Sequence, residues 1–316
     1  MQILDVGVDV SKDSVVAAQP AGMLATIPNR RAELMTWLKT LPPGSRLAVE
    51  ATGRYHSLLA DLADSLGFVV YVLNPKDVHY YAKGLGRRGK TDQIDAQVIA
   101  RYLAKEHEQL RVYHTPDPQQ RELDQLLLRR ARVVALRSAL RASLQDLPLV
   151  SEELAATLER MDALLLQMDQ RRDTLNAANA ERQQAQQRLQ SIVGVGPVVG
   201  AGLGQALERI PFGDADAFVA YTGLDPRPMD SGKKVGRRRL SKRGPAELRR
   251  LLYNAAMSAA KTKLWRPFYE RQRAKGLSTT AALVVLARKI ARVAWSIHRY
   301  RTTFNPQMIS GLDVKP

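Results

Sequence analysis

Residues 3–11 read ILDVGVDVS, and this stretch decides how the front of the chain folds. Its Val and Ile residues are typical of a buried β-strand. Asp9 interrupts the apolar pattern, and a carboxylate in a buried strand is costly unless another group compensates its charge. The sequence therefore predicts a core strand in which Asp9 has a functional role and not only a structural one.

Strand and helix signals alternate downstream of this strand. Two short strands come first, then a helix with apolar spacing that ends before Pro42-Pro43-Gly44. The expected elements are strands 14–20 and 22–28, helix 32–41, strand 46–52, helix 56–68, strand 68–75, a Gly- and Arg-rich loop 83–92 and helix 92–106. Three strands, helix, strand, helix, strand and helix is the order of an RNase H-like α/β domain.

Three more acids stand at positions that match Asp9. Glu50 ends the apolar strand LAVE, and Asp92 and Asp95 share one face at the start of a helix. If the strands of Asp9 and Glu50 are neighbours, all four carboxylates can meet near the strand ends. Four like charges repel, and Mg²⁺, which prefers carboxylate oxygens and water, would compensate them.

Each of these acids also has an explanation without chemistry. Asp92 is well placed to cap its helix, and Asp95 would interact favourably with the helix dipole. Glu50 could be a surface acid at a strand end. The set is more informative than any member, because perturbed carboxylates cluster at functional sites.

The segment from about 118 to 191 is nearly all helical by its spacing. Arg172 takes one position of a short heptad seam whose apolar members are Leu154, Leu158, Met161, Leu165, Met168 and Leu175. Two interpretations stay open. One is a coiled-coil arm that dimerises the protein, and the other is an intramolecular helical hairpin with Pro148 near its bend.

The excess positive charge lies in the last third of the chain. Residues 227–316 hold 22 Lys and Arg and four acids, whereas the residues before them hold 26 bases and 27 acids. A glycine turn and helix are expected at 192–203, and three helices after Pro245. Clustered charge of this kind is the footprint of phosphate binding, so this part is expected to contact a polyanion.

Two serines, Ser231 and Ser241, flank the densest basic run, which comprises Lys233, Lys234, Arg237, Arg238, Arg239, Lys242 and Arg243. Lys and Arg bind phosphate and stabilise charge in a phosphoryl-transfer transition state. A serine held there could attack a DNA phosphodiester. Ser241 also suits the lead-in and cap of a helix, and Ser231 also suits an ordinary loop. The residues alone therefore leave two interpretations open, a loop with a serine nucleophile and a loop that is only basic.

Composition excludes several other classes. The chain has no Cys, so disulfides, cysteine-bound zinc and a thiol nucleophile are excluded. Its five His show no metal-binding spacing, and no apolar run is long enough to span a membrane. The N-terminus lacks the pattern of a signal peptide, so we expect a cytoplasmic, nucleoid-associated protein.

Together these motifs resemble one family. In order between Ile3 and Tyr300 they are VGVDVSKD, AVEATGRYH, LNPKDVHYYA, KTDQIDAQVIA, IVGVGP, FVAYTGLDPR, DSGKKVGRRRLSKRG and LRRLLYNAAMSA. They resemble the insertion-sequence transposases of the one-ten type, named for an Asp-Glu-Asp-Asp (DEDD) motif. Piv-type DNA invertases and bridge-RNA-guided recombinases belong to that group.

The resemblance implies a RuvC-like, RNase H-fold domain at 1–110, a helical coiled-coil region at 118–190 and a mostly α-helical transposase domain at 191–305. It implies that Asp9, Glu50, Asp92 and Asp95 bind Mg²⁺, or Mn²⁺ in its place, and that Ser231 is the nucleophile. The family's site is composite, with acids and serine from different subunits, which implies a dimer or tetramer. DNA and a structured guide RNA are the implied partners.

The implied activity is excision and insertion of a mobile element through a covalent 5′-phosphoserine intermediate. Three alternatives remain at this point. They are a Piv-type invertase, a hydrolytic nuclease that uses only the acids, and a nucleic-acid-binding protein without catalysis.

Overall fold

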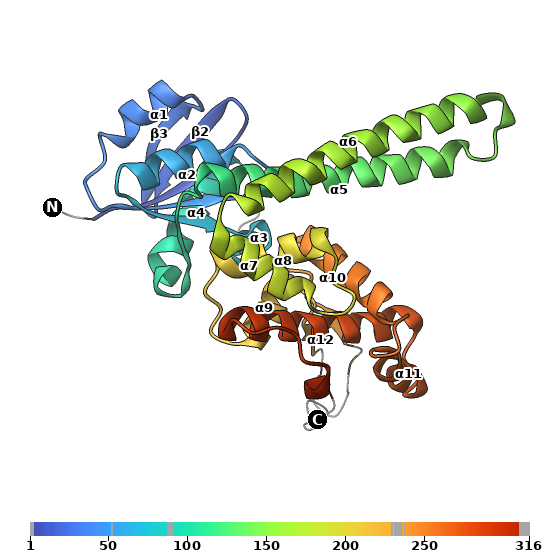
Figure 1. The fold of residues 1–316 in the computed structure, drawn as a ribbon. Coiled ribbons are helices and arrows are strands. Elements are labelled where there is room, and N and C mark those ends of the chain that lie inside the picture. The colour runs from blue at the N-terminus through green and yellow to red at the C-terminus, as the bar shows by residue number, and fades with distance from the viewer. Residues whose placement is uncertain are drawn as a thin grey trace. The chain divides into compact units, whose positions relative to one another are not determined.

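A computed structural model of the chain describes residues 3–51, 53–86, 91–228, 230, 236 and 238–309. The chain divides into two compact units, residues 1–117 (unit 1) and 118–316 (unit 2) (Figure 1). The three-part division expected from the sequence stays a prediction. Within the described ranges, no helix is long and apolar enough to cross a membrane.

Unit 1 is a mixed sheet covered by helices on both faces. Its sheet has the strand order β3-β2-β1-β4-β5-β6, in which β4 lies parallel to both β1 and β5. The elements are β1 Asp5–Val10, β2 Ser14–Gln19, β3 Gly22–Pro28, α1 Arg31–Leu38, β4 Arg46–Glu50, α2 His56–Ser65, β5 Val69–Leu73, α3 Pro75–Gly84, α4 Asp92–Glu106, η1 His107–Gln109 and β6 Val112–Tyr113. The expected α/β front is confirmed, whereas its finer likeness to RNase H stays a prediction.

Alternation along the strands assigns one core to each face of the sheet. Val6 and Val8 of β1 pack with Leu34 of α1 and Leu59 of α2. The opposite face presents residues such as Ala48, which join a separate core with α3 and α4. Because side chains of a strand alternate between faces, Asp9 lies on the face covered by α4.

Residues 76–82, to which no element was assigned from the sequence, belong to helix α3. Asn74 caps α3 by accepting a hydrogen bond from the Lys76 backbone N–H at 3.0 Å, and Pro75 takes the first helical position. Pro suits that position because its fixed φ matches a helix and its missing N–H would have no partner there.

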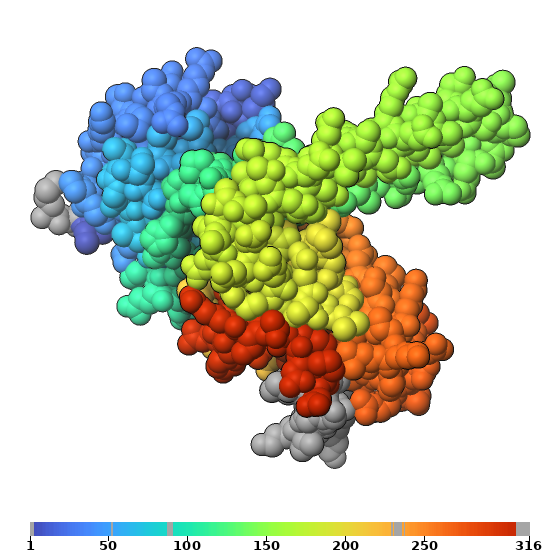
Figure 2. Space-filling view, in the orientation of Figure 1, coloured from blue at the N-terminus to red at the C-terminus, as the bar shows by residue number. Residues whose placement is uncertain are grey.

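Unit 2 begins with a long antiparallel hairpin, α5 Pro118–Leu144 and α6 Ser151–Ala177, joined through η2 Pro148–Val150. The ion pairs Glu122–Arg171, Arg130–Asp169 and Arg137–Asp162 join the two helices in antiparallel register. Leu165 and Leu175 of the heptad seam are buried. The seam therefore packs within one chain, with Pro148 at the bend. A dimeric coiled coil stays a prediction. The outer half of the hairpin does not pack against the other helices of unit 2 (Figure 2).

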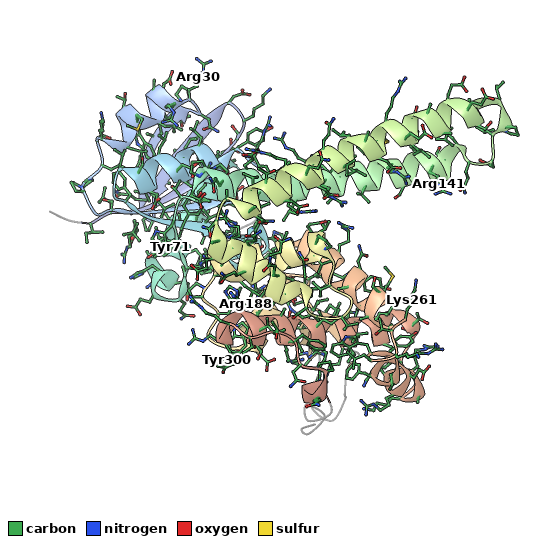
Figure 3. All side chains as sticks on the ribbon, in the orientation of Figure 1. Arg30, Tyr71, Arg141, Arg188, Lys261 and Tyr300 are labelled. Carbon is green, nitrogen blue, oxygen red and sulfur yellow. The ribbon has the colours of Figure 1, made fainter. Side chains whose placement is uncertain are left out.

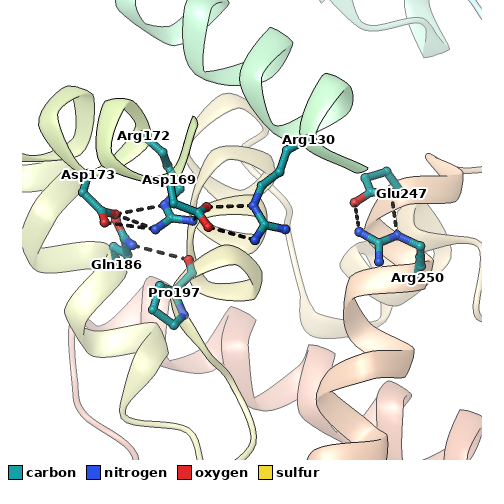
Figure 4. A network of polar contacts seen from close by, with 8 residues as sticks. All are labelled: Arg130, Asp169, Arg172, Asp173, Gln186, Pro197, Glu247 and Arg250. Atoms are coloured by element: carbon teal, nitrogen blue, oxygen red, sulfur yellow. Dashed lines mark hydrogen bonds and ion pairs between the residues drawn. The ribbon is translucent and has the colours of Figure 1, made fainter. Parts of the chain in front are cut away.

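Arg172 interrupts the seam without leaving an unpaired charge. Its side chain is 5% exposed and pairs with both Asp169 and Asp173 (Figure 4). Burial alone would raise the pKa of Asp169, but hydrogen bonds and charge from Arg130 and Arg172 hold it below its usual range. A buried charge is tolerated here because neighbouring acids compensate it.

The rest of unit 2 is a helical core. Its elements are α7 Ala180–Gln190, α8 Pro197–Arg209, α9 Ala215–Thr222, β7 Pro226–Arg227, β8 Arg239–Leu240, α10 Ala246–Ala259, α11 Arg266–Ala274, α12 Thr279–Tyr300 and η3 Pro306–Ile309. Trp265 is fully buried at its centre and donates a hydrogen bond from Nε1 to the Val193 carbonyl at 3.0 Å. The helices expected after Pro245, and the glycine turn before α8, are confirmed.

Candidate active site

The sheet places two of the four acids side by side. β1 and β4 are parallel neighbours, and Val8 pairs with Val49 in their register. The next residues, Asp9 and Glu50, therefore stand at the same level where both strands approach their carboxyl ends. This is the arrangement that the sequence predicted on condition that the two strands were adjacent. Both residues are half-buried.

Helix α4 lies directly on β1 because Gly7 has no side chain. A Cβ atom at Gly7 would lie 2.0 Å from the backbone N of Ala100 and 2.3 Å from the carbonyl O of Ala96. No other residue type permits this approach. Gly7 was not singled out from the sequence, although a glycine inside a Val-rich strand is a known signal of close backbone contact.

The remaining two acids come from the first turn of α4. Thr91 is the N-cap of this helix, and its side chain accepts a hydrogen bond from the Ile94 backbone N–H at 3.2 Å. The expectation that Asp92 is the cap is therefore wrong. Asp92 is instead the first helical residue, and Asp95 follows one turn later on the same side.

The electrostatics of Asp9 show that the four acids interact. Burial raises the pKa of Asp9 to about 6, and the negative charges of Asp92, Asp95 and Glu50 contribute to the rise in that order. A carboxylate with both low solvation and like-charged neighbours is typical of functional sites.

The chemistry of this cluster suits a hard divalent cation, because its charged donors are all carboxylate oxygens. The half-buried position of Asp9 and its repulsion by three other carboxylates support such a fit. Within the described residues, however, no group of three or more acids and histidines is already arranged to hold an ion. The side chains as they stand form an acidic cluster, and binding an ion would require them to converge.

Nearby acids of unit 1 have structural partners instead. Asp5 accepts two hydrogen bonds from Arg46, at 2.6 and 2.9 Å. Asp61 accepts one from the Tyr113 hydroxyl at 2.7 Å. These hydrogen bonds give Asp5 and Asp61 structural roles, which distinguishes them from the four acids of the cluster.

The basic loop of unit 2 leaves and returns at one place. β7 and β8 pair antiparallel, with Arg227 opposite Arg239. Just inside them, Asp230 accepts hydrogen bonds from the Gly236 backbone N–H at 3.0 Å and from Arg238 at 2.5 Å. Hydrogen bonding to Arg238 holds the pKa of Asp230 below its usual range. These contacts bring the two ends of the loop together.

The expected nucleophile falls inside this loop. Ser231, Lys233, Lys234 and Arg237 lie outside the described residues. The other expected nucleic-acid-binding residues are exposed; they are Arg238, Arg239, Lys242 and Arg243. Exposure leaves their side chains accessible to a phosphate backbone.

Ser241, the second serine of the basic run, has a structural role. Its residue is 9% exposed, its hydroxyl donates to the Asp225 carboxylate, and its backbone N–H donates to the Asp225 carbonyl at 3.0 Å. Ser241 does belong to the lead-in of α10, as the sequence suggested, but the N-cap of this helix is Pro245 and not Ser241. The engaged hydroxyl argues against Ser241 as a nucleophile.

Comparison with known families matches both units. The profile of a family described as "Transposase", the DEDD type of IS110, covers residues 6–147, and that of the "Transposase IS116/IS110/IS902 family" covers residues 186–270. The chain belongs to this family of transposases, which makes it a DNA-recombination enzyme. The resemblance of its motifs to that family is thereby confirmed.

Individual relatives align over nearly the whole chain. The pilin gene-inverting protein of Moraxella bovis is 27% identical over 96% of this chain and 98% of its own length. A probable family 20 transposase of Pseudomonas aeruginosa is 28% identical over 88% and 90%, respectively. The transposase for insertion sequence element IS1111A of Coxiella burnetii is 26% identical over 94% and 90%.

Proposed function

We propose that this chain excises and inserts a DNA element by strand exchange, with the acids of unit 1 and the serine loop of unit 2 as its reactive groups. The observation that carries the proposal is the placement of Asp9, whose pKa is raised to about 6 by burial first and by the charges of three other carboxylates second. Asp5, an acid of the same strand with a structural role, pairs with Arg46, whereas the neighbouring charges that shift the pKa of Asp9 are those of carboxylates.

Asp9, Glu50, Asp92 and Asp95 would together hold Mg²⁺ or Mn²⁺. The bound ion would offset their charge and act as a Lewis acid on the scissile phosphate. The chain's own contribution is to fix the carboxylates on two paired strands and one closely packed helix. Sites on rigid elements hold their geometry better than sites on loops.

Ser231 would act as the nucleophile from the loop whose ends β7 and β8 hold. Its Oγ would form a bond to phosphorus while the bond from phosphorus to the 3′ oxygen breaks. The serine proton would be transferred, directly or through water, to the departing 3′ oxygen, leaving a 5′-phosphoserine link. This exchange of one ester for another conserves the phosphodiester energy for rejoining, which hydrolysis would lose.

The exposed bases of the loop would contact the DNA backbone, and a structured guide RNA would select the DNA partners. Homo-oligomerisation as a dimer or tetramer would let acids and serine of different subunits form one site. Both points rest on the family resemblance. A second candidate is site-specific inversion, and the relation to a pilin gene-inverting protein over nearly the full chain favours it.

Covalent trapping tests the proposal. Purified protein, Mg²⁺, DNA that flanks the element and co-expressed RNA are mixed and resolved on a denaturing gel. We expect a protein–DNA adduct that Asp9→Asn and Ser231→Ala abolish. Ser241→Ala is the matched control and should retain the adduct in the fraction of protein that remains folded.

Strand breaks without an adduct, unaffected by Ser231→Ala, would identify a metal-dependent nuclease and refute the serine step. Salt-sensitive DNA binding with neither breaks nor adduct would refute catalysis altogether. Inversion and transposition share this chemistry, so the two are separated by the products formed on inverted and on single recombination sites.

A further inference from the structure

Unit 2 contains a cavity that neither the acids nor the serine loop use. It lies among the end of α6 and helices α7, α8 and α12, and its volume is about 340 Å³. Figure 3 labels Arg188, one of its lining residues, where these helices come together. A cavity of this size falls in the range of pockets that hold small organic ligands.

Buried polar groups without a partner line this cavity. Asn176 is 4% exposed and Gln205 is 8% exposed, and among the described residues the side-chain amide nitrogen of each has no hydrogen-bond partner. The Nε of Arg188 is also buried and has no hydrogen-bond partner within the part of the chain that the structure describes. Folded proteins rarely leave such groups unsatisfied, so a cavity with three of them is a site for a polar ligand.

The chemistry of these groups specifies the ligand. The Arg188 Nε–H can only donate, so its missing partner must be a hydrogen-bond acceptor. Amide side chains present both donors and acceptors, which is the pattern that reads the edge of a nucleobase. The cavity thus offers a donor for an oxyanion beside groups that can recognise a planar polar ring.

The charge of the lining points the same way. Four arginines, Arg182, Arg188, Arg299 and Arg301, face two glutamates, Glu181 and Glu208. Two ion pairs, Arg182–Glu208 at 3.3 Å and Arg301–Glu181 at 2.8 Å, match these acids one to one. Among the described lining residues, the charges of Arg188 and Arg299 exceed those of the acids, and guanidinium groups bind phosphate with good geometry.

We propose that this cavity binds one unpaired nucleotide, with its phosphate on Arg188 and Arg299 and its base against the amides of Asn176 and Gln205. This site is independent of the proposed metal and serine chemistry, so it can be tested whether or not the protein is active. The nucleotide could belong to a nucleic-acid strand or be free, and both sources present the same chemistry.

His298 provides a direct readout. It lines the cavity, and burial together with the charge of Arg188 lowers its pKa below the usual range. A phosphate that binds beside it should therefore shift its ring resonances. The chain has five His, so the signals are assigned by comparison with His298→Gln.

The experiment titrates the full-length protein with deoxyadenosine monophosphate, and separately with single-stranded DNA and RNA oligonucleotides of one sequence. Arg188→Gln removes the proposed phosphate contact. Lys261→Gln removes one charge from an exposed position beyond the end of α10, away from the cavity (Figure 3), and is the matched control. Asn176→Leu removes an amide but keeps the side-chain volume.

We expect a saturable His298 shift in the wild type and in Lys261→Gln, with affinity at least about tenfold weaker in Arg188→Gln. Asn176→Leu should also weaken binding, while its melting temperature stays at or above that of the wild type because an unsatisfied group has been removed. A response to the mononucleotide would assign a free nucleotide, and a response to oligonucleotides alone would assign a strand.

Two results would overturn the proposal. One is the absence of any His298 shift with all three ligands. The other is an equal loss of affinity in Arg188→Gln and Lys261→Gln, which would show that binding reflects only the overall charge of unit 2.

Discussion

Replacing Gly7 by alanine is the sharpest test of how unit 1 positions its acids. The new Cβ would lie 2.0 Å from the Ala100 backbone N, whereas ordinary contact begins at 3.4 Å. The obstructing atoms are backbone, so no side chain can rotate away. Helix α4 must therefore move outward by about 1.4 Å, and Asp92 and Asp95 move with it.

Two magnitudes follow from this displacement. Overpacking a tight core typically costs about 1–3 kcal/mol, and the backbone clash at Gly7 places this variant at the upper end. In a unit of this size that corresponds to a fall of roughly 10 °C in melting temperature. Misplacement of reacting groups by about 1 Å can lower a rate about 100-fold.

The assay combines thermal melting, metal-dependent DNA cleavage and NMR titration of the Asp9 carboxyl. Because Asp92 and Asp95 raise the pKa of Asp9, their retreat in Gly7→Ala should lower that pKa toward its ordinary value. A merely unstable protein that keeps its geometry would not show this change.

Gly22→Ala is the matched control, since a Cβ at Gly22 would meet no atom of the described residues within 4 Å. We expect it to melt and cleave like the wild type. If Gly7→Ala matched Gly22→Ala in melting temperature, cleavage rate and Asp9 titration, Gly7 would not set the position of α4.

Three further outcomes can be measured by unfolding experiments. The pKa of Asp9 is about 6 in the folded protein and 3.8 in the unfolded chain, so the stability of the wild type should fall as the pH rises from about 4 to 6. The substitution Asp9→Asn should therefore stabilise the metal-free protein by roughly 1–2 kcal/mol at pH 8 but not at pH 4. Equal melting curves of the two proteins at pH 8 would contradict this expectation. Ser241→Ala should cost about 1–2 kcal/mol because the half-buried Asp225 loses a donor, and an unchanged melting temperature would count against the structural role of Ser241. Trp265→Ala should lower the free energy of unfolding by about 3–5 kcal/mol in chemical denaturation, since the indole is fully buried and donates a hydrogen bond to the Val193 carbonyl. A decrease below about 1 kcal/mol would show that the core repacks around the smaller side chain.

The strands and the site's outline could be predicted because they depend on local patterns. Alternating Val residues and turn signals located β1 and β4, and the acids at their ends followed from the sequence. The adjacency of Asp9 and Glu50 needed only the assumption that these strands are neighbours, which the sheet order confirms. The roles of the four acids and of Ser231 stay predictions.

What the sequence did not reveal depends on contacts across the fold. The close approach of α4 to Gly7 is a tertiary contact, and only the unexpected glycine hinted at it. The cap of α4 was placed one residue late because Thr91 and Asp92 are both good capping residues. The heptad seam was ambiguous because the same stripe suits a partner helix from its own chain or from another.

The paired strands β7 and β8, with Asp230 just inside them, hold the ends of the loop that contains Ser231, so that this loop can be replaced as a unit. The ends of this segment are held by the pairing of β7 with β8 and by the hydrogen bonds that Asp230 accepts from Gly236 and Arg238. Closing a loop costs only about 0.6 kcal/mol more for each doubling of its length. Length and sequence in this segment can therefore change with little effect on the helical core, so new specificities can evolve, or be engineered, while the scaffold stays the same.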